Sequence, residues 1–191
     1  MAEYSDKELI ELYRNGGNPH YAFNMIVARY QERLYWHIRK MVISHDDADD
    51  VLQNTLVKTW HGLPTFRSDS QLFTWIYRIA TNEALTFLAQ KKRRFFIPMV
   101  DVEKKLSETL ESDPYFSGDE IQLKLQKAIL TLPEKQRLVF NMKYFEEMKY
   151  EEMSEILGTS VGALKASYHH AVKKIEAYFH EEIPELFVNE N

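Results

Sequence analysis

The sequence contains 191 residues, with 24 Lys and Arg against 29 Asp and Glu, so its formal net charge is −5. It has no cysteine, which excludes a disulfide scaffold, a thiol nucleophile and a thiolate metal site. No apolar run approaches the roughly 18 residues of a membrane span, and residues 1–6 lack the basic and apolar regions of a signal peptide. We therefore expect a cytoplasmic protein without membrane insertion of its own, long enough for one large or two small domains.

Helical periodicity dominates the first half of the chain. Ser5 and Glu8 form a capping-box pattern, which predicts a helix that begins here and ends near Gly16. A long helix follows, because apolar residues recur at intervals of three and four. These residues are Phe23, Ile26, Val27, Tyr30, Leu34, Ile38 and Met41. Two further helices are predicted over about 47–60 and 70–91, separated by a Gly-Leu-Pro break at 62–64.

Residues 96–118 contain two prolines and few well-spaced apolar side chains, and an unstructured stretch of this length is uncommon inside a compact domain. We interpret it as a flexible linker between a domain at 1–95 and a domain at 119–182, which a tail at 183–191 follows. Helical patterns resume over about 119–132, 138–145, 150–157 and 161–179. The predicted fold class is all-α, with two small helical domains of which the second ends in a helix-turn-helix.

The segment 150–165 has the pattern of a helix-turn-helix. Gly158 can adopt the left-handed conformation that ends the first helix, and Ser160 is a favourable N-cap for the second. When Leu164 and Ala171 face inward, the opposite face carries no acidic residue. That face consists of Lys165, Ala166, Ser167, His169, His170 and Lys173. Such residues suit contacts with base edges and phosphates in a major groove; a plain helical hairpin is the alternative.

Local charge differs from the charge of the whole chain. Between residues 56 and 100, seven basic residues oppose two acidic ones, Asp69 and Glu83, so this window carries +5. Four of the basic residues are consecutive, Lys91 to Arg94, and they also suit the C-terminal end of a helix. Because phosphate contacts are local, the window is a candidate nucleic-acid surface although the chain is acidic overall.

Two patterns resemble catalytic sites, and both have simpler explanations. Residues 158–162 match a nucleophile elbow, but that chemistry needs a preceding strand and a downstream acid and histidine, so Ser160 as a helix cap is favoured. The acidic cluster 46–50 resembles the Mg²⁺ motif of all-helical isoprenoid synthases, without a second metal motif. A small all-helical Mg-dependent enzyme using Asp46, Asp47 and Asp50 is therefore an alternative to an acidic helix start or an acidic surface for a basic partner.

Three motif blocks, in order over nearly the whole chain, are similar to those of extracytoplasmic-function (ECF) sigma factors of bacterial RNA polymerase, within the sigma-70 family. The first block covers residues 46–60 (DDADDVLQNTLVKTW). In the family this helix binds the coiled coil of the polymerase β′ clamp, which is a basic surface. The resemblance therefore assigns core-polymerase binding to Asp49, Asp50, Gln53 and Asn54.

The second block covers residues 66–85 (FRSDSQLFTWIYRIATNEAL) and is similar to the promoter-melting and −10 recognition regions, where a loop captures a base flipped from the non-template strand. The resemblance maps this pocket onto residues 66–71, with Asn82 near it. A polar loop beside aromatic rings can read and stack on an extruded base. The residues assigned to −10 recognition and melting are Phe66, Arg67, Ser68, Asp69, Gln71, Asn82, Lys91, Lys92, Arg93 and Arg94.

The third block covers residues 132–140 (LPEKQRLVF) and the helix-turn-helix that follows. It resembles the region that reads the −35 element as duplex, which places the outward residues of the second helix, Lys165 to Lys173, at the DNA. The family often carries arginines at these positions. This chain has lysine, alanine and histidines instead, so the usual −35 preference is not expected to carry over.

The resemblance implies a dissociable polymerase subunit that directs the core enzyme to specific promoters, assists strand opening and catalyses no reaction. The implied partners are bacterial core RNA polymerase, through its β′ clamp and β flap, promoter DNA and, as for many members, an anti-sigma factor. No catalytic residue, metal site or cofactor is expected. Two alternatives stay open: a helix-turn-helix regulator that binds duplex DNA without polymerase, and the Mg-dependent enzyme.

Overall fold

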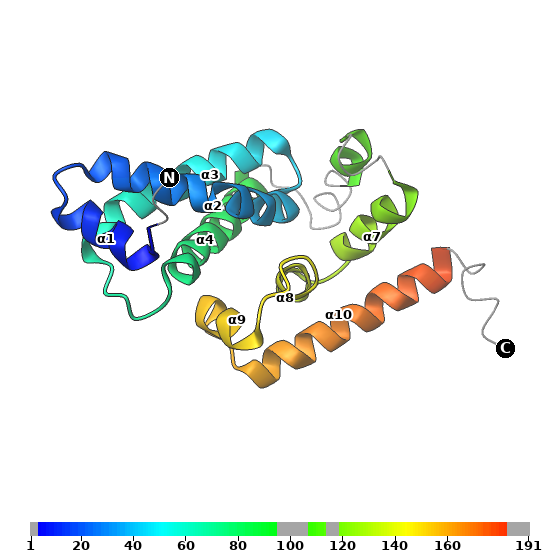
Figure 1. Cartoon of the computed structure of the whole chain (residues 1–191). Coiled ribbons are helices and arrows are strands. Elements are labelled where there is room, and N and C mark those ends of the chain that lie inside the picture. The colour runs from blue at the N-terminus through cyan, green and yellow to red at the C-terminus, as the bar shows by residue number, and fades with distance from the viewer. Residues whose placement is uncertain (1–3, 95–106, 114–118, 183–191) are drawn as a thin grey trace. The chain divides into compact units, whose positions relative to one another are not determined.

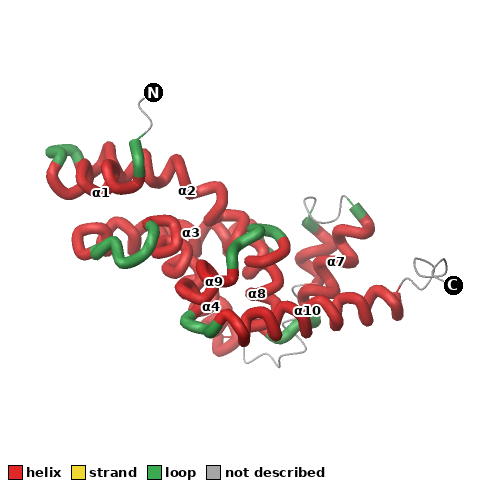
Figure 2. Tube along the Cα trace, turned by 60° about the horizontal axis from the view of Figure 1, so that its bottom comes forward, coloured by secondary structure: helices red, strands yellow, loops and turns green. Residues whose placement is uncertain are grey.

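The computed structural model (Figure 1) describes residues 4–94, 107–113 and 119–182, and every regular element within these ranges is a helix (Figure 2). The all-α prediction is thus confirmed. The chain divides into two compact units, Met1–Gln90 and Lys91–Asn191, which we call unit 1 and unit 2. In the described ranges no helix is both long enough and apolar enough to cross a membrane. The predicted tail, 183–191, lies outside the described residues.

Unit 1 begins with helix α1 (Asp6–Asn15), whose N-terminus carries the predicted capping box. The Ser5 hydroxyl accepts a hydrogen bond from the Glu8 N–H at 3.3 Å, and the Glu8 carboxylate accepts one from the Ser5 N–H at 2.6 Å. Hydrogen bonds from the hydroxyl and the N–H of Ser5 lower the pKa of the Glu8 carboxyl. Helix α2 (Pro19–Val42) follows, and Arg29 holds α1 against it through an ion pair with Asp6 at 2.6 Å.

The rest of unit 1 packs around α2. Helix α3 (His45–Gly62) begins two residues before the predicted helix, and the 3₁₀ helix η1 (Leu63–Thr65) occupies the predicted break. Helix α4 (Leu72–Arg94) completes the unit with all but its last four residues. Helix α2 contacts both α1 and α3, and the largest buried side chains here are apolar or aromatic. They include Leu9, Ile26, Leu34, Ile38, Leu63, Ile76 and Tyr77.

A buried histidine links α2 to α4. His37 is 1% exposed, its Nε2 lies 2.9 Å from the Thr81 hydroxyl, and its Nδ1 lies 2.6 Å from the Tyr77 hydroxyl. Thr81 donates its single hydroxyl proton to the Tyr77 carbonyl, so it must accept from the histidine Nε2–H, which leaves Nδ1 to accept from Tyr77. Burial, with a smaller contribution from Lys40, lowers the pKa of His37 to about 3. The histidine is therefore a neutral link between the two helices.

The prediction of a linker without secondary structure is wrong for part of 96–118. Residues 107–112 are helical, the Leu110 side chain is fully buried, and the Glu111 carboxylate forms an ion pair with Lys127 of unit 2. Sequence periodicity missed this turn because one buried leucine does not make an apolar stripe. The rest of the predicted linker, 95–106 and 114–118, lies outside the described residues.

Unit 2 contains α7 (Glu120–Leu130), α8 (Glu134–Tyr144), α9 (Tyr150–Leu157) and α10 (Val161–Glu182). The Asp119 carboxylate caps α7 by accepting from the N–H groups of Ile121 and Gln122 at 2.8 and 3.1 Å. Pro133 stands between α7 and α8, where a residue without an N–H is tolerated at a helix start. Helix α10 contacts α7, α8 and α9, so the position of each of these helices depends on it.

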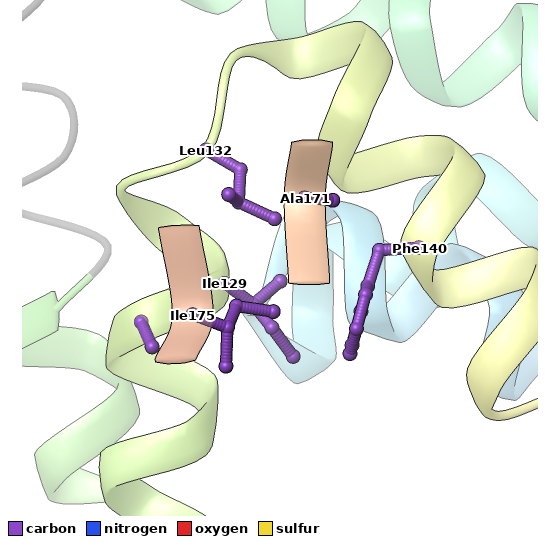
Figure 3. Close-up of a cluster of buried hydrophobic side chains, with 6 residues drawn as sticks. Ile129, Leu132, Phe140, Ala171 and Ile175 are labelled. Atoms are coloured by element: carbon purple, nitrogen blue, oxygen red, sulfur yellow. The ribbon is translucent and has the colours of Figure 1, made fainter. Parts of the chain in front are cut away.

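The core of unit 2 forms where α7, α8 and α10 meet (Figure 3). Ile129 of α7 and Phe140 of α8 pack against Ala171 and Ile175 of α10, with Leu132 from the intervening turn. Each of these side chains is 8% exposed or less. Two of them lie on α10, so the core determines which face of α10 points inward. It is the face that the sequence predicted.

Candidate nucleic-acid and protein interfaces

Helix α3 presents a polar face to solvent. The Ser44 hydroxyl caps it by accepting from the Asp47 N–H at 3.4 Å, and Asp46 and Asp47 occupy the first turn, where the helix dipole favours negative charge. The buried face consists of Ala48, Val51, Thr55 and Thr59. The exposed residues of α3 are His45, Asp46, Asp50, Gln53, Asn54, Val57, Lys58 and His61. Spacings of three and four align these exposed residues along one side of the helix.

Asp49 lies beside this exposed face and is half-buried. Its carboxylate lies 3.6 Å from the His45 Nε2, and the other ring nitrogen of His45 lies 2.7 Å from the Tyr35 hydroxyl. Within the residues that the structure describes, no three His, Asp or Glu side chains are grouped so that they could hold a metal ion. The cluster containing Asp46, Asp47 and Asp50 therefore lends no support to the Mg-dependent enzyme.

The predicted base-reading loop, 66–71, joins η1 to α4. The Phe66 side chain is 6% exposed, and its ring lies 4.9 Å from that of Trp75, centroid to centroid. Phe66 thus anchors the loop in unit 1 rather than offering its ring at the surface. Ser68 has a φ of 59°, in the left-handed region that non-glycine residues rarely adopt. The exposed side chains of the loop are Arg67, Ser68, Asp69 and Gln71.

Asn82 is exposed on α4. It lies three turns of α4 beyond Gln71, which at 1.5 Å per residue is about 16 Å along the helix. That Asn82 lies near the loop stays a prediction. Asn82 shares one polar face of α4 with Thr86 and Arg93, at helical spacings of four and seven. Lys91 and Arg93 are exposed, whereas the side chains of Lys92 and Arg94 lie outside the described residues.

The helix-turn-helix has the predicted caps. Gly158 adopts φ 62° and ψ 28°, and its N–H donates to the Ser154 carbonyl at 2.9 Å. The Ser160 hydroxyl accepts from the Ala163 N–H at 3.3 Å. Ser160 follows helix α9 rather than a strand, so its interpretation as a helix cap rather than a nucleophile is confirmed. The buried corner is formed by Met153, Ile156 and Leu164.

Lys149 occupies the N-cap position of α9, although its side chain cannot accept a hydrogen bond. The Glu152 carboxylate compensates by accepting from the Lys149 N–H at 3.2 Å. Nearby, the Tyr150 ring lies below two cations, with the Lys143 and Lys165 ammonium groups 5.1 and 5.7 Å from its centroid. Burial raises the pKa of the Tyr150 hydroxyl. These contacts connect the start of α9 to the basic face of α10.

The outward face of α10 is exposed where the sequence predicted it. Lys165, Ala166, His169, His170 and Lys173 are exposed, and Ser167 is half-buried. The two histidine rings are neighbours, with centroids 5.9 Å apart. No acidic residue occurs on α10 before Glu176, so about four turns of this face carry only basic, small or hydrogen-bonding side chains. Such a face suits DNA phosphates and base edges.

Comparisons with known proteins match both units. Residues 26–94 match the family described as Sigma-70 region 2, and residues 122–175 match the family described as Sigma-70, region 4. The ECF RNA polymerase sigma-E factor of Escherichia coli K12 is 29% identical over 184 residues, which cover 91% of this chain and 94% of that protein. The chain belongs to the extracytoplasmic-function group of the sigma-70 family.

Two solved structures have a similar fold. CnrH, in complex with the cytosolic domain of CnrY, matches with a TM-score of 0.67 at 24% identity, over 92% of this chain and 97% of that chain. The sigma factor RpoE from Bartonella quintana, in complex with the anti-sigma factor NepR, matches with a TM-score of 0.65 at 20% identity, over 88% and 98%.

This ECF sigma factor directs core RNA polymerase to specific promoters and assists strand opening at the start of transcription. Family membership disfavours both alternatives, the polymerase-independent regulator and the Mg-dependent enzyme. Sequence reasoning missed two features of the surfaces described above. Val57 is 55% exposed on the polar face of α3, and Arg14 of α1 contacts the loop at 66–71. Helical spacing could have found Val57, whereas no local pattern marks Arg14.

Proposed function

We propose that the sigma factor divides its work among three exposed surfaces. The polar face of α3, with Asp49, Asp50, Gln53 and Asn54, binds core polymerase. The loop at 66–71 and the polar face of α4 bind and open the −10 region. The outward face of α10 reads the −35 element as duplex.

The proposed residues for the −10 region are those of the loop and of α4. Arg67, Ser68, Asp69 and Gln71 are the exposed loop side chains, and Phe66 contributes as their buried anchor. Asn82, Lys91 and Arg93 extend the surface along α4, together with Lys92 and Arg94, whose side chains lie outside the described residues. A basic helix beyond a polar loop suits a strand whose backbone must be held while one base is read.

One observation carries this proposal: acidic and basic side chains are segregated onto different exposed helix faces. The face of α3 offers carboxylates and amides, with Lys58 paired to Glu83, whereas the face of α10 offers lysines and histidines without any carboxylate before Glu176. Like charges repel across an interface, so the first face suits a basic protein surface and the second suits DNA.

The corresponding domain division is 1–95 for core binding and the −10 region, 96–118 as connector, 119–182 for the −35 region and 183–191 as tail. We also propose that the chain has no catalytic activity of its own and acts in the cytoplasm, where its polymerase partner works. An anti-sigma factor is a further proposed partner, supported by the similar structure of RpoE with NepR.

The test of the whole proposal uses sigma-free bacterial core polymerase. Adding the purified chain should produce transcripts that start at defined positions on a promoter library, with the −35 and −10 elements read from the selected sequences. If the chain neither bound the core enzyme nor produced start-site-specific transcripts, the proposal would fail.

The α3 surface is tested by Asp50→Asn, which removes the charge and keeps the shape. The variant should bind core polymerase about ten-fold more weakly, because an interfacial charge pair loses one partner. Glu32→Gln is the matched control, since Glu32 is exposed on α2 and lies outside the proposed surface. An equal loss of affinity in both variants would show a general effect of charge rather than a contact at α3.

A further inference from the structure

Arg14 lies in the last turn of α1, outside residues 26–94 that match Sigma-70 region 2. Its Nη2 donates to the Leu63 carbonyl at 3.3 Å and to the Phe66 carbonyl. These two carbonyls belong to η1 and to the first residue of the loop at 66–71. One guanidinium nitrogen carries two N–H groups, so Arg14 holds both ends of this short turn at once.

The same end of α1 makes a second contact with this part of unit 1. The Tyr13 hydroxyl donates to the Trp60 carbonyl at 2.9 Å, and the two rings meet edge to face with centroids 5.1 Å apart. Carbonyls at a helix C-terminus have no partner within the helix and need one from elsewhere. Tyr13 and Arg14 supply such partners to the end of α3 and to η1, so α1 determines where the chain leaves α3 and enters the loop.

The loop depends on this entry point because it has no helix or strand of its own. Its first residue, Phe66, is fixed twice: its ring packs on Trp75, and its carbonyl accepts from Arg14. Two residues later, Ser68 has a φ of 59°, and a left-handed conformation at a serine persists only where its surroundings hold it. Arg14 fixes the carbonyl that lies two residues before this serine.

We infer that Arg14 is a positioning residue for base capture, acting through the Phe66 carbonyl on the exposed side chains of the loop. The inference rests on the proposed role of the loop in −10 recognition. Arg14 touches no DNA in this account. It lowers the entropic cost of capture by keeping the loop in the conformation that receives the base.

The direct test is hydrogen exchange of the full-length chain. Arg14→Met keeps the aliphatic stem and removes both hydrogen bonds, so amides at 66–71 should exchange faster while those of α2 stay unchanged. Arg29→Met is the matched control, because Arg29 also ties down α1, through Asp6, but does not touch the loop. Unchanged exchange in the loop of Arg14→Met, or an equal increase in both variants, would overturn the inference.

The functional test measures promoter opening by the reconstituted holoenzyme, from the permanganate reactivity of unpaired thymines on a promoter that the wild-type holoenzyme selects. Arg14→Met should slow opening about 3- to 10-fold, as expected for loss of a charge-assisted hydrogen bond, with unchanged affinity for core polymerase and unchanged upstream footprint. Arg14→Lys should recover part of the rate, because one ammonium retains the charge without the planar fork. Opening at the wild-type rate in Arg14→Met would overturn the inference.

A loop variant in the same assay separates this inference from the proposal beneath it. Asp69→Ala combined with Gln71→Ala should slow opening at least as much as Arg14→Met does. If the loop variant slows opening and Arg14→Met does not, only the positioning role fails. If the loop variant opens the promoter like the wild type, the proposed role of the loop fails, and the positioning role fails with it.

Discussion

The two proposed DNA-reading elements differ in what holds them. The outward face of α10 belongs to a helix with local caps, Gly158 before it and Ser160 at its start. The opposite face of this helix packs on α7 and α8 through Ala171 and Ile175. The loop at 66–71 has no internal hydrogen-bond ladder and is held by Arg14 and Trp75, from helices elsewhere in unit 1. Duplex DNA presents a regular groove that a rigid helix fits, whereas an extruded base needs a shaped pocket.

The largest effect is expected when a core side chain that packs against α10 is removed. Phe140 is 4% exposed and stacks on Tyr144 and Tyr168, so Phe140→Ala should destabilise unit 2 by about 3–5 kcal/mol. Thermal unfolding followed by circular dichroism measures this loss. Binding of −35 duplex should fall with it, while hydrogen exchange in unit 1 stays as in the wild type. Tyr144→Ala is the control, because that ring is 52% exposed and should cost much less.

Low pH should destabilise unit 1. His37 stays neutral in the folded chain, since burial lowers its pKa to about 3 from its ordinary value of 6.5, so the unfolded chain binds more protons between these two pH values. Stability that is present above pH 6.5 is lost as pH falls toward 3, and this one group accounts for about 2 kcal/mol at pH 5. Urea unfolding of unit 1 at pH 7.5 and pH 5 measures the loss.

A variant isolates the histidine from the other groups that titrate in this range. His37→Gln can still hydrogen-bond to Thr81 and Tyr77 but cannot titrate. Its stability should therefore fall less than that of the wild type between pH 7.5 and pH 5. The same slope in both proteins would show that His37 does not control the acid sensitivity of unit 1.

The same substitution at two glycines of the helix-turn-helix should change the stability of unit 2 in opposite directions. Gly158 has a φ of 62°, so Gly158→Ala should destabilise unit 2 by about 1–2 kcal/mol. Gly162 lies in the first turn of α10, and a Cβ added there would meet no atom within 4 Å, so Gly162→Ala should stabilise the helix by about 0.5–1 kcal/mol. Thermal unfolding of the two variants measures both changes. A loss of stability in Gly158→Ala alone would show that the left-handed turn, and not the number of glycines, determines the stability of the helix-turn-helix.

The smallest expected effect is the loss of one phosphate contact. Lys165→Ala should weaken binding of −35 duplex and reduce the slope of log K against log salt by about 1. Lys124→Ala is the control, because Lys124 forms an ion pair with Glu120 on α7, away from the outward face of α10. An unchanged salt slope in Lys165→Ala would show that Lys165 does not contact a phosphate and that the DNA contact lies elsewhere in unit 2.

Sequence alone determined the elements whose interactions are local. Capping hydrogen bonds at Ser5, Asp119 and Ser160 span only a few residues, and helical spacing separates the inward from the outward face of α10. The opposed charges on α3 and α10 could likewise be predicted, because the sequence itself gives the charge of each side chain. For these reasons the net charge of −5 did not hide the basic outward face of α10.

Only the tertiary structure decided the features that join distant residues. Arg14 meets carbonyls 49 and 52 residues further along the chain, and Phe66 turns inward onto Trp75. The His37 link and the buried Leu110 are of the same kind. A local pattern encodes contacts within about one turn, whereas these contacts exist only once helices pack, so the packing alone reveals them.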